Sequence, residues 1–190
     1  MSLILSKPKN IECPSEEQLR SYYKDNCGEI GYMFVKNGKV IIHKGFYRFC
    51  DFYKDFLENY SKNIPIVIHF RTEYATTGRT TYSDQPYVVA NNVDEGNCYI
   101  ASCDVAFVHN GYISKLSSYT TSISDSLLFG VEYLSLIATG KEWHNDRKNV
   151  ELVNKLIGDY NTMAIMSSDE RIELLGRFYF KDGVSYSKEV

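Results

Sequence analysis

The sequence opens with Met1-Ser2-Leu3-Ile4-Leu5-Ser6-Lys7-Pro8, a short apolar run that is closed by a lysine and a proline. This pattern predicts a strand over residues 2–6, because proline interrupts local structure. Residue 2 then lies at the end of that strand. Removal of the initiator methionine would leave Ser2 with a hydroxyl and a free α-amino group, which titrates at about pH 7.7 to 8.0. One residue would then supply a nucleophile and its general base.

The composition is typical of one globular domain, which we expect to span residues 1–190. The chain is 44% hydrophobic and 24% charged, and a chain of 190 residues can bury a core without disulfides or metals. A net charge of -3 and a pI near 5.8 disfavour direct nucleic-acid binding. The 5 cysteines include no CxxC pair, so we expect reduced thiols and neither metal nor cofactor. Without a signal-peptide core or a long apolar stretch, we expect a cytoplasmic protein that does not enter a membrane.

Both strands and helices are predicted. Ser15 and Gln18 form a capping box that starts a helix, and Asn37-Gly38 between two apolar runs indicates a β-hairpin. Large apolar residues at helical spacing predict a core-facing helix over 46–60. Residues 72–102 are polar and turn-rich, so we expect a loop or a loose hairpin there. The expected helices span 15–25, 46–60, 124–139 and 146–157, the expected strands span 2–6, 31–35, 40–42, 64–70, 104–108, 162–166, 172–175 and 177–180, and a last hairpin turn is expected at 182–183.

Several polar residues stand where these elements end or begin. Arg71 emerges from the strand at 64–70, and a guanidinium can hold a carboxylate with two hydrogen bonds. Asn110 and Gly111 follow the strand at 104–108, and a side-chain amide beside a glycine N–H can stabilise an oxyanion. Asp125 begins a predicted helix and could accept a hydrogen bond from an ammonium group. Simpler explanations compete: an Asn-Gly pair is more often only a turn, and an acidic residue suits a helix N-terminus.

With these residues in this order, the chain resembles a stand-alone class II glutamine amidotransferase domain of the N-terminal nucleophile (Ntn) hydrolase superfamily, of the small type encoded by phages and bacteria. The resemblance covers nearly the whole chain. Beyond the opening stretch it is carried by Gly31-Tyr32-Met33, His69-Phe70-Arg71, Ala75-Thr76-Thr77-Gly78, Val108-His109-Asn110-Gly111-Tyr112-Ile113, Ser124-Asp125, Met163-Ala164-Ile165-Met166 and Asp182-Gly183-Val184-Ser185-Tyr186-Ser187.

The resemblance implies an α+β fold, a four-layer αββα sandwich, that hydrolyses the side-chain amide of glutamine or of a γ-glutamyl compound and releases ammonia. A fused synthase is not expected in a chain of this length, so ammonia would pass to a separate ammonia-accepting synthase or be released by plain hydrolysis. The roles implied on matching positions are nucleophile for Ser2, oxyanion hole for Asn110 and Gly111, and substrate binding for Arg71, Thr76, Thr77 and Asp125.

The chain also departs from this family. The family's nucleophile is cysteine, and the hydroxyl of Ser2 is a much poorer nucleophile at neutral pH than a thiol, whose pKa is about 8.5. We therefore expect little or no glutaminase turnover. In addition, two residues are inserted after Arg71, and Thr77 and Gln85 stand where the family has histidines. Ser2 has three explanations at this stage: a cysteine replaced on purpose, a serine that works as the nucleophile, or a natural loss of catalysis.

Two other functions compete with amide hydrolysis. A non-catalytic amino-acid-binding or protein-interaction module would keep Arg71 and Asp125 and need no thiol. A metal hydrolase would use His69 and His109, but the four histidines of the chain show no HExxH-like spacing. The metal hydrolase is therefore the weaker of the two.

Overall fold

The computed structural model describes residues 2–72, 84–116 and 123–190, and within them the strands form two antiparallel sheets. The predicted mixture of helices and strands is confirmed. Thr76 and Thr77, two of the predicted substrate-binding residues, lie outside the described residues.

The larger sheet places the first strand of the chain in its interior, next to the central strand β4. Its order is β10-β11-β1-β4-β2-β3-β6, and β1 pairs with β11 on one side and with β4 on the other. β2 and β3 form the predicted hairpin, with positive φ angles of 54° at Asn37 and 69° at Gly38. The strands are β1 (Leu3–Lys7), β2 (Cys27–Lys36), β3 (Lys39–Phe46), β4 (Ile66–Thr72), β6 (Ile100–Cys103), β10 (Tyr179–Lys181) and β11 (Val184–Tyr186).

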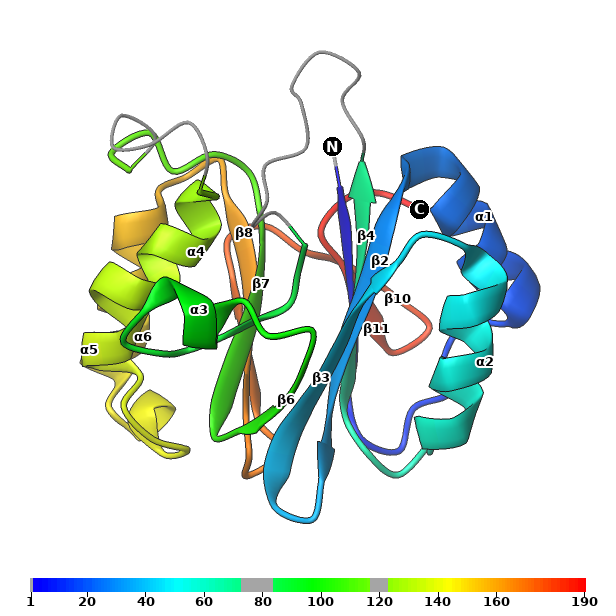
Figure 1. The fold of residues 1–190 in the computed structure, drawn as a ribbon, viewed down its shortest axis with the longest axis horizontal. Coiled ribbons are helices and arrows are strands. Elements are labelled where there is room, and N and C mark those ends of the chain that lie inside the picture. Colours follow the sequence, from blue (N-terminus) through cyan, green and yellow to red (C-terminus); the bar gives the residue numbers. More distant parts are fainter. Residues whose placement is uncertain (1, 73–83, 117–122) are drawn as a thin grey trace.

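The smaller sheet faces the larger one, and helices cover the outer face of each (Figure 1). Its order is β5-β7-β8-β9, from β5 (Tyr87–Val88), β7 (Val105–Asn110), β8 (Thr162–Ser167) and β9 (Ile172–Leu175). The larger sheet carries α1 (Glu16–Asn26) and α2 (Phe49–Asn59). The smaller sheet carries α3 (Val93–Gly96), α4 (Asp125–Phe129), the π-helical turn η1 (Gly130–Leu134), α5 (Ser135–Ile137), the 3₁₀ turn η2 (Trp143–Asn145) and α6 (Arg147–Ile157).

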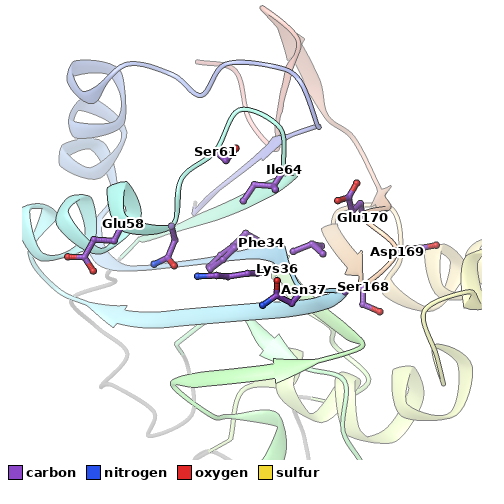
Figure 2. A pocket seen from close by; sticks show the side chains of 12 residues that line it. Phe34, Lys36, Asn37, Glu58, Ser61, Ile64, Ser168, Asp169 and Glu170 are labelled. Atoms are coloured by element: carbon purple, nitrogen blue, oxygen red, sulfur yellow. The ribbon is translucent and has the colours of Figure 1, made fainter.

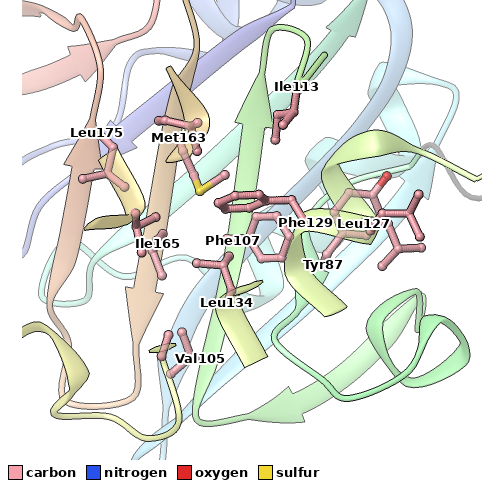
Figure 3. Packing of buried hydrophobic residues seen from close by; sticks show 14 of the residues in the cluster. Tyr87, Val105, Phe107, Ile113, Leu127, Phe129, Leu134, Met163, Ile165 and Leu175 are labelled. Carbon is pink, nitrogen blue, oxygen red and sulfur yellow. The ribbon is translucent and has the colours of Figure 1, made fainter. Parts of the chain in front are cut away.

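Three buried apolar clusters hold these layers together. Phe52 and Phe56 of α2 pack on the helix-facing side of the larger sheet. On the smaller sheet, Phe107 and Phe129 belong to the cluster beneath its helices (Figure 3). The third cluster joins the two sheets, and Met33 is one of its fully buried members. Burial of apolar side chains on both faces of both sheets is the main stabilising contribution to this layered arrangement.

Strand alternation decides which polar side chains face the gap between the sheets. Ile4 of β1 and Val67 of β4 belong to the cluster in that gap. Because successive side chains of a strand point to opposite faces, Ser2 lies on the side of Ile4, and both His69 and Arg71 lie on the side of Val67. Leu3 and Phe70 pair across the two strands, so the ends that carry Ser2 and Arg71 are adjacent.

The same alternation on β7 separates Asn110 from His109. Val108 belongs to the cluster between the sheets, whereas Phe107 belongs to the cluster under the helices. Asn110 therefore faces the gap and His109 faces the helices. Pairing with β8 continues through Asn110, so this strand is longer than the predicted 104–108 and the turn begins only at Gly111.

Four other predictions of element bounds were wrong. β3 continues to Phe46, which pairs with Ile30, so α2 begins at Phe49 instead of residue 46. Where a loop or a loose hairpin was predicted over 72–102, residues 84–103 contain β5, α3 and β6, and the edge of β3 offers hydrogen-bonding partners to β6. The predicted helix at 124–139 is divided by η1, and the strand predicted at 177–180 spans Tyr179–Lys181.

Candidate functional site

A cavity of about 1120 Å³ lies where β1, β4 and β7 end, next to the N-terminal end of α4. The predicted site residues within the described part of the chain all line it: Ser2, Arg71, Asn110, Gly111 and Asp125. They come from segments far apart in the sequence and from both sheets. The cavity is thus the one candidate site that the sequence and the structure share.

Ser2 is held by groups from both sheets. Its Oγ accepts a hydrogen bond from the backbone N–H of Thr72, with an N–O distance of 3.0 Å. Its carbonyl oxygen accepts one from Nδ2 of Asn110 at 2.6 Å. The hydroxyl at the proposed nucleophile position is therefore fixed at the strand end, within the cavity wall.

Ser187 is a site residue that the predictions did not single out. Its Oγ accepts a hydrogen bond from the buried N–H of Ile4 at 2.9 Å and lies 3.4 Å from Nδ2 of Asn110. It follows β11, which pairs with β1. Ser187 therefore connects the strand that carries Ser2 to the amide of Asn110.

Gly111 has a backbone conformation and surroundings that exclude a side chain. Its φ is 139°, and a Cβ there would overlap Oδ1 of Asn161 and lie 2.9 Å from its Cγ. Oδ1 of Asn161 accepts a hydrogen bond from the N–H of Tyr112 at 2.6 Å, and Nδ2 donates to the carbonyl of Ile157 at 2.6 Å. The small residue thus lets the buried Asn161 side chain fasten the turn after β7 to the end of α6.

His109 has a structural environment. Its Nδ1 lies 2.7 Å from Oγ of Ser126 and its Nε2 lies 2.9 Å from Oδ1 of Asn161. Burial lowers the pKa of its imidazole, although Asp125 and Asn161 oppose this shift. Both ring nitrogens already have partners, which weighs against a metal-binding role.

His69 belongs to β4, lies on the face directed at the gap between the sheets, and lines the cavity. It is 1% exposed, and neither ring nitrogen has a hydrogen-bonding partner among the described residues. Burial, with the positive charge of Arg71, lowers the pKa of its imidazole to about 3, so the ring is neutral. In residues 2–72, 84–116 and 123–190, no group of three or more His, Cys, Asp or Glu side chains is arranged to hold a metal ion.

Asp125 is the first residue of α4 and faces the turn that follows Gly111. Its Oδ2 accepts a hydrogen bond from the N–H of Ile113 at 2.6 Å, and its Oδ1 accepts one from the N–H of Ser126 at 2.8 Å. Asp125 therefore has a structural role at the N-terminus of α4, as an acidic residue in that position often does. Each carboxylate oxygen has a second lone pair, so the same side chain keeps the capacity to accept from an ammonium group.

Arg71 pairs with a buried carboxylate that the sequence did not reveal. Its Nη1 lies 3.3 Å from Oδ1 of Asp84, whose side chain is 9% exposed. The other carboxylate oxygen accepts hydrogen bonds from the hydroxyls of Tyr47 and Tyr99. The carbonyl of Asp84 accepts one from Nζ of Lys44 at 2.9 Å. Asp84 is thus held by side chains that come from three separate segments.

Two more buried titratable groups lie beside this pair. Burial, strengthened by the charge of Asp84, raises the pKa of Glu29 to about 8, and one of its oxygens accepts a hydrogen bond from the N–H of Gly45 at 2.7 Å. Burial lowers the pKa of Lys44 to about 8. At pH 7 Glu29 is therefore mostly protonated, and its carboxyl does not compete with Asp84 for Arg71.

A second cavity lies at the opposite end of the gap between the sheets. It has a volume of about 670 Å³ and is bordered by the β2-β3 hairpin and the turn that contains Ser168 and Glu170 (Figure 2). Charged side chains of both signs border it, Lys36 and Glu58 among them. None of the predicted site residues belongs to it, and it offers no grouping of a nucleophile with a base.

Among the described residues, no helix has the length and apolar character needed to cross a membrane. Comparisons with known proteins do not supply a family for the chain. No protein-family model matches it, and no curated protein matches it in sequence.

Proposed function

We propose that this protein is an amidohydrolase of the N-terminal nucleophile type, with the αββα sandwich of class II glutamine amidotransferases, and that it acts on the side-chain amide of glutamine or of a γ-glutamyl compound. One observation carries the proposal. A hydroxyl, an amide donor, a glycine, a guanidinium and a carboxylate from distant segments line a single cavity. Together they match the chemistry of binding a free amino acid and attacking its amide.

The proposed reaction assigns one role to each group. The α-amine of Ser2 takes the hydroxyl proton while Oγ forms a bond to the amide carbon. Nδ2 of Asn110 and the N–H of Gly111 stabilise the oxyanion. The C–N bond then breaks, the proton passes to the departing ammonia, and water hydrolyses the remaining ester. Arg71 and Asp125 hold the carboxylate and the ammonium of the substrate throughout.

This mechanism requires that the amine of Ser2 be free, which means removal of Met1. It also uses a hydroxyl, so we expect turnover well below that of a thiol enzyme with the same pocket. The ammonia would be released to water or accepted by a separate synthase. Both outlets are compatible with the cavity, which is open to solvent at the exposed Tyr112 and Tyr160.

Binding without turnover is the second candidate. It is favoured by the contact between Asn110 and the Ser2 carbonyl, because a donor already used in this way is less available to an oxyanion. In that case the same cavity would bind an amino acid as a sensor or scaffold, and Ser2 would be only part of its wall.

The test is glutamate release from L-glutamine by the wild-type protein and by Ser2→Cys, with intact mass establishing the loss of Met1 in both. Ser185→Cys in β11 is the matched control, because it adds a thiol outside the cavity. Amide hydrolysis predicts that only Ser2→Cys gains substantial activity. If both processed proteins are silent but bind L-glutamine in calorimetry, the binding candidate replaces hydrolysis. If neither turnover nor binding occurs, both candidates are wrong.

A further inference from the structure

The segment that begins at Asp84 lies directly against the larger sheet beneath the cavity. Gly31 of β2 makes this contact possible, because a Cβ at that position would overlap the carbonyl oxygen of Gln85 and lie 2.9 Å from its carbonyl carbon. Gly31 pairs with His69 of β4, two residues before Arg71. The close approach therefore places Asp84 next to the strand that delivers Arg71 to the cavity.

Gln85 fastens the same segment to the facing sheet. Its Nε2 donates to the carbonyl of His109 at 3.0 Å, and its Oε1 accepts from the N–H of His109 at 2.6 Å. The side chain thus makes the two hydrogen bonds that a neighbouring strand would make, and it is 7% exposed. Asp84 and Gln85 are consecutive. They therefore connect the backbone of His109, which precedes Asn110, to the carboxylate that contacts Arg71.

Asp84 itself has little freedom to move. The hydroxyls of Tyr47 and Tyr99 both donate to Oδ2, which leaves Oδ1 directed at Arg71. The contact with Arg71 uses one guanidinium nitrogen, Nη1, at 3.3 Å. A guanidinium has five N–H donors in a planar fork, so a contact at one nitrogen orients the group without excluding a second carboxylate.

We propose that Asp84 is a positioning residue that sets the orientation of Arg71 for the carboxylate of an amino-acid ligand, with Gln85 as the anchor that keeps Asp84 in place. This inference rests on the proposed function, because it takes Arg71 as the carboxylate-binding group. Glu29 is protonated at neutral pH and leaves this task to Asp84. The consequence is selectivity: Asp84 contributes to the affinity only for ligands that carry a carboxylate at the position bound by Arg71.

Two ligands separate positioning from a general structural effect. L-glutamine has the α-carboxylate, whereas L-glutaminamide has a neutral carboxamide in its place. In calorimetry on the full chain, Asp84→Asn should weaken L-glutamine binding about tenfold, because a misoriented guanidinium loses part of its charge-assisted bonding, and should change L-glutaminamide binding less than about twofold. Gln85→Met should reproduce this selective loss without removing the carboxylate.

Asp55→Asn is the matched control. Asp55 also accepts from a tyrosine hydroxyl, that of Tyr32, but lies in α2 away from the cavity. It should leave the affinity for both ligands unchanged. An equal loss for both ligands in Asp84→Asn would show a merely structural role and overturn the inference. Tighter L-glutamine binding would overturn it as well, because Asp84 would then be a competitor for Arg71.

Failure of the proposed function has a different signature: the wild-type protein would bind neither ligand. The orientation of Arg71 can still be read from its side-chain N–H signals by NMR, identified through Arg71→Lys. Asp84→Asn should shift or broaden these signals, and Asp55→Asn should not. If the Arg71 signals are the same in Asp84→Asn as in wild type, Asp84 does not position Arg71 and the inference is wrong.

Discussion

Gly111→Ala should be one of the most destabilising single-methyl changes in this protein, for a reason that can be worked out from the site. A φ of 139° is adopted almost only by glycine, and it would cost an alanine roughly 1 to 3 kcal/mol. The added Cβ would also displace Oδ1 of Asn161, which accepts from the N–H of Tyr112 and contacts Nε2 of His109. Each buried polar group left without a partner costs about 1 to 3 kcal/mol. The free energy of unfolding should therefore fall by about 3 kcal/mol or more.

The assay is urea unfolding at 25 °C, followed by circular dichroism, with Gly38→Ala as the matched control. Gly38 also has a positive φ, 69°, but a Cβ there would meet nothing within 4 Å. The control therefore reports the backbone contribution alone, about 1 kcal/mol. The difference between the two variants combines the contribution of Asn161 with the higher backbone cost of φ 139°, provided that the denaturant slope m is unchanged.

Two results would refute this reasoning. One is a loss in Gly111→Ala that lies within about 0.5 kcal/mol of the loss in Gly38→Ala, since independent small effects agree to that level. The other comes from the double variant with Asn161→Ala. If the clash with Asn161 is the cause, Gly111→Ala should cost much less in that background, so simple additivity would contradict the mechanism.

Two further predictions concern buried groups near the cavity. Burial raises the pKa of Glu29 to about 8 from an ordinary value of 4.5, so its contribution to stability is fully present below pH 4.5 and is lost as the pH rises to about 8. The stability of Glu29→Gln relative to wild type should therefore rise through this range, by at most about 1.4 kcal/mol per pH unit, and a flat difference in pH-dependent urea unfolding would contradict the raised pKa. Ser187→Ala removes the partner of the buried N–H of Ile4 and should lower stability by about 1 to 3 kcal/mol, whereas Ser185→Ala, the control in the same strand region, should change it by less than about 0.5 kcal/mol.

The placement of Ser2 and of Arg71 at strand ends was predictable because it depends on local patterns. An apolar run gives a strand, alternation gives the side on which each residue lies, and both residues stand at strand ends. Even so, the sequence alone does not pair the two strands, and the resemblance to a family was needed to bring Asn110 into the same site. The turn predicted over 109–111 begins only at Gly111, because hydrogen bonds to β8 extend β7 through Asn110.

Asp84, Asn161 and Ser187 could not have been predicted in the same way. Each lies outside a periodic segment, and each acts through long-range contacts, among them those with Arg71, with the turn after Gly111 and with Ile4. Polar residues in turns are common, and their usual role is local. Only the tertiary packing brings Asn161 to the cavity and places Asp84 and Ser187 against the cavity residues Arg71 and Asn110. No pattern in the nearby sequence therefore distinguishes them from ordinary turn residues.

Glu29 is an exception to the rule that charged residues are seldom buried, and this exception bears on the role of the cavity. The strand was predicted to begin at residue 31, and a charged residue such as Glu29 is almost never fully buried unless it is paired. β2 begins at Cys27, and Glu29 is 2% exposed, which is tolerable because a protonated carboxyl costs far less to bury than a carboxylate. Lys44 is also buried close by, and so is His69, whose ring nitrogens have no hydrogen-bonding partner in the part of the chain that the structure describes. Proteins keep such locally unfavourable features mainly where function requires them. Their concentration around Arg71 therefore supports a ligand-binding role for this cavity independently of whether Ser2 is a nucleophile.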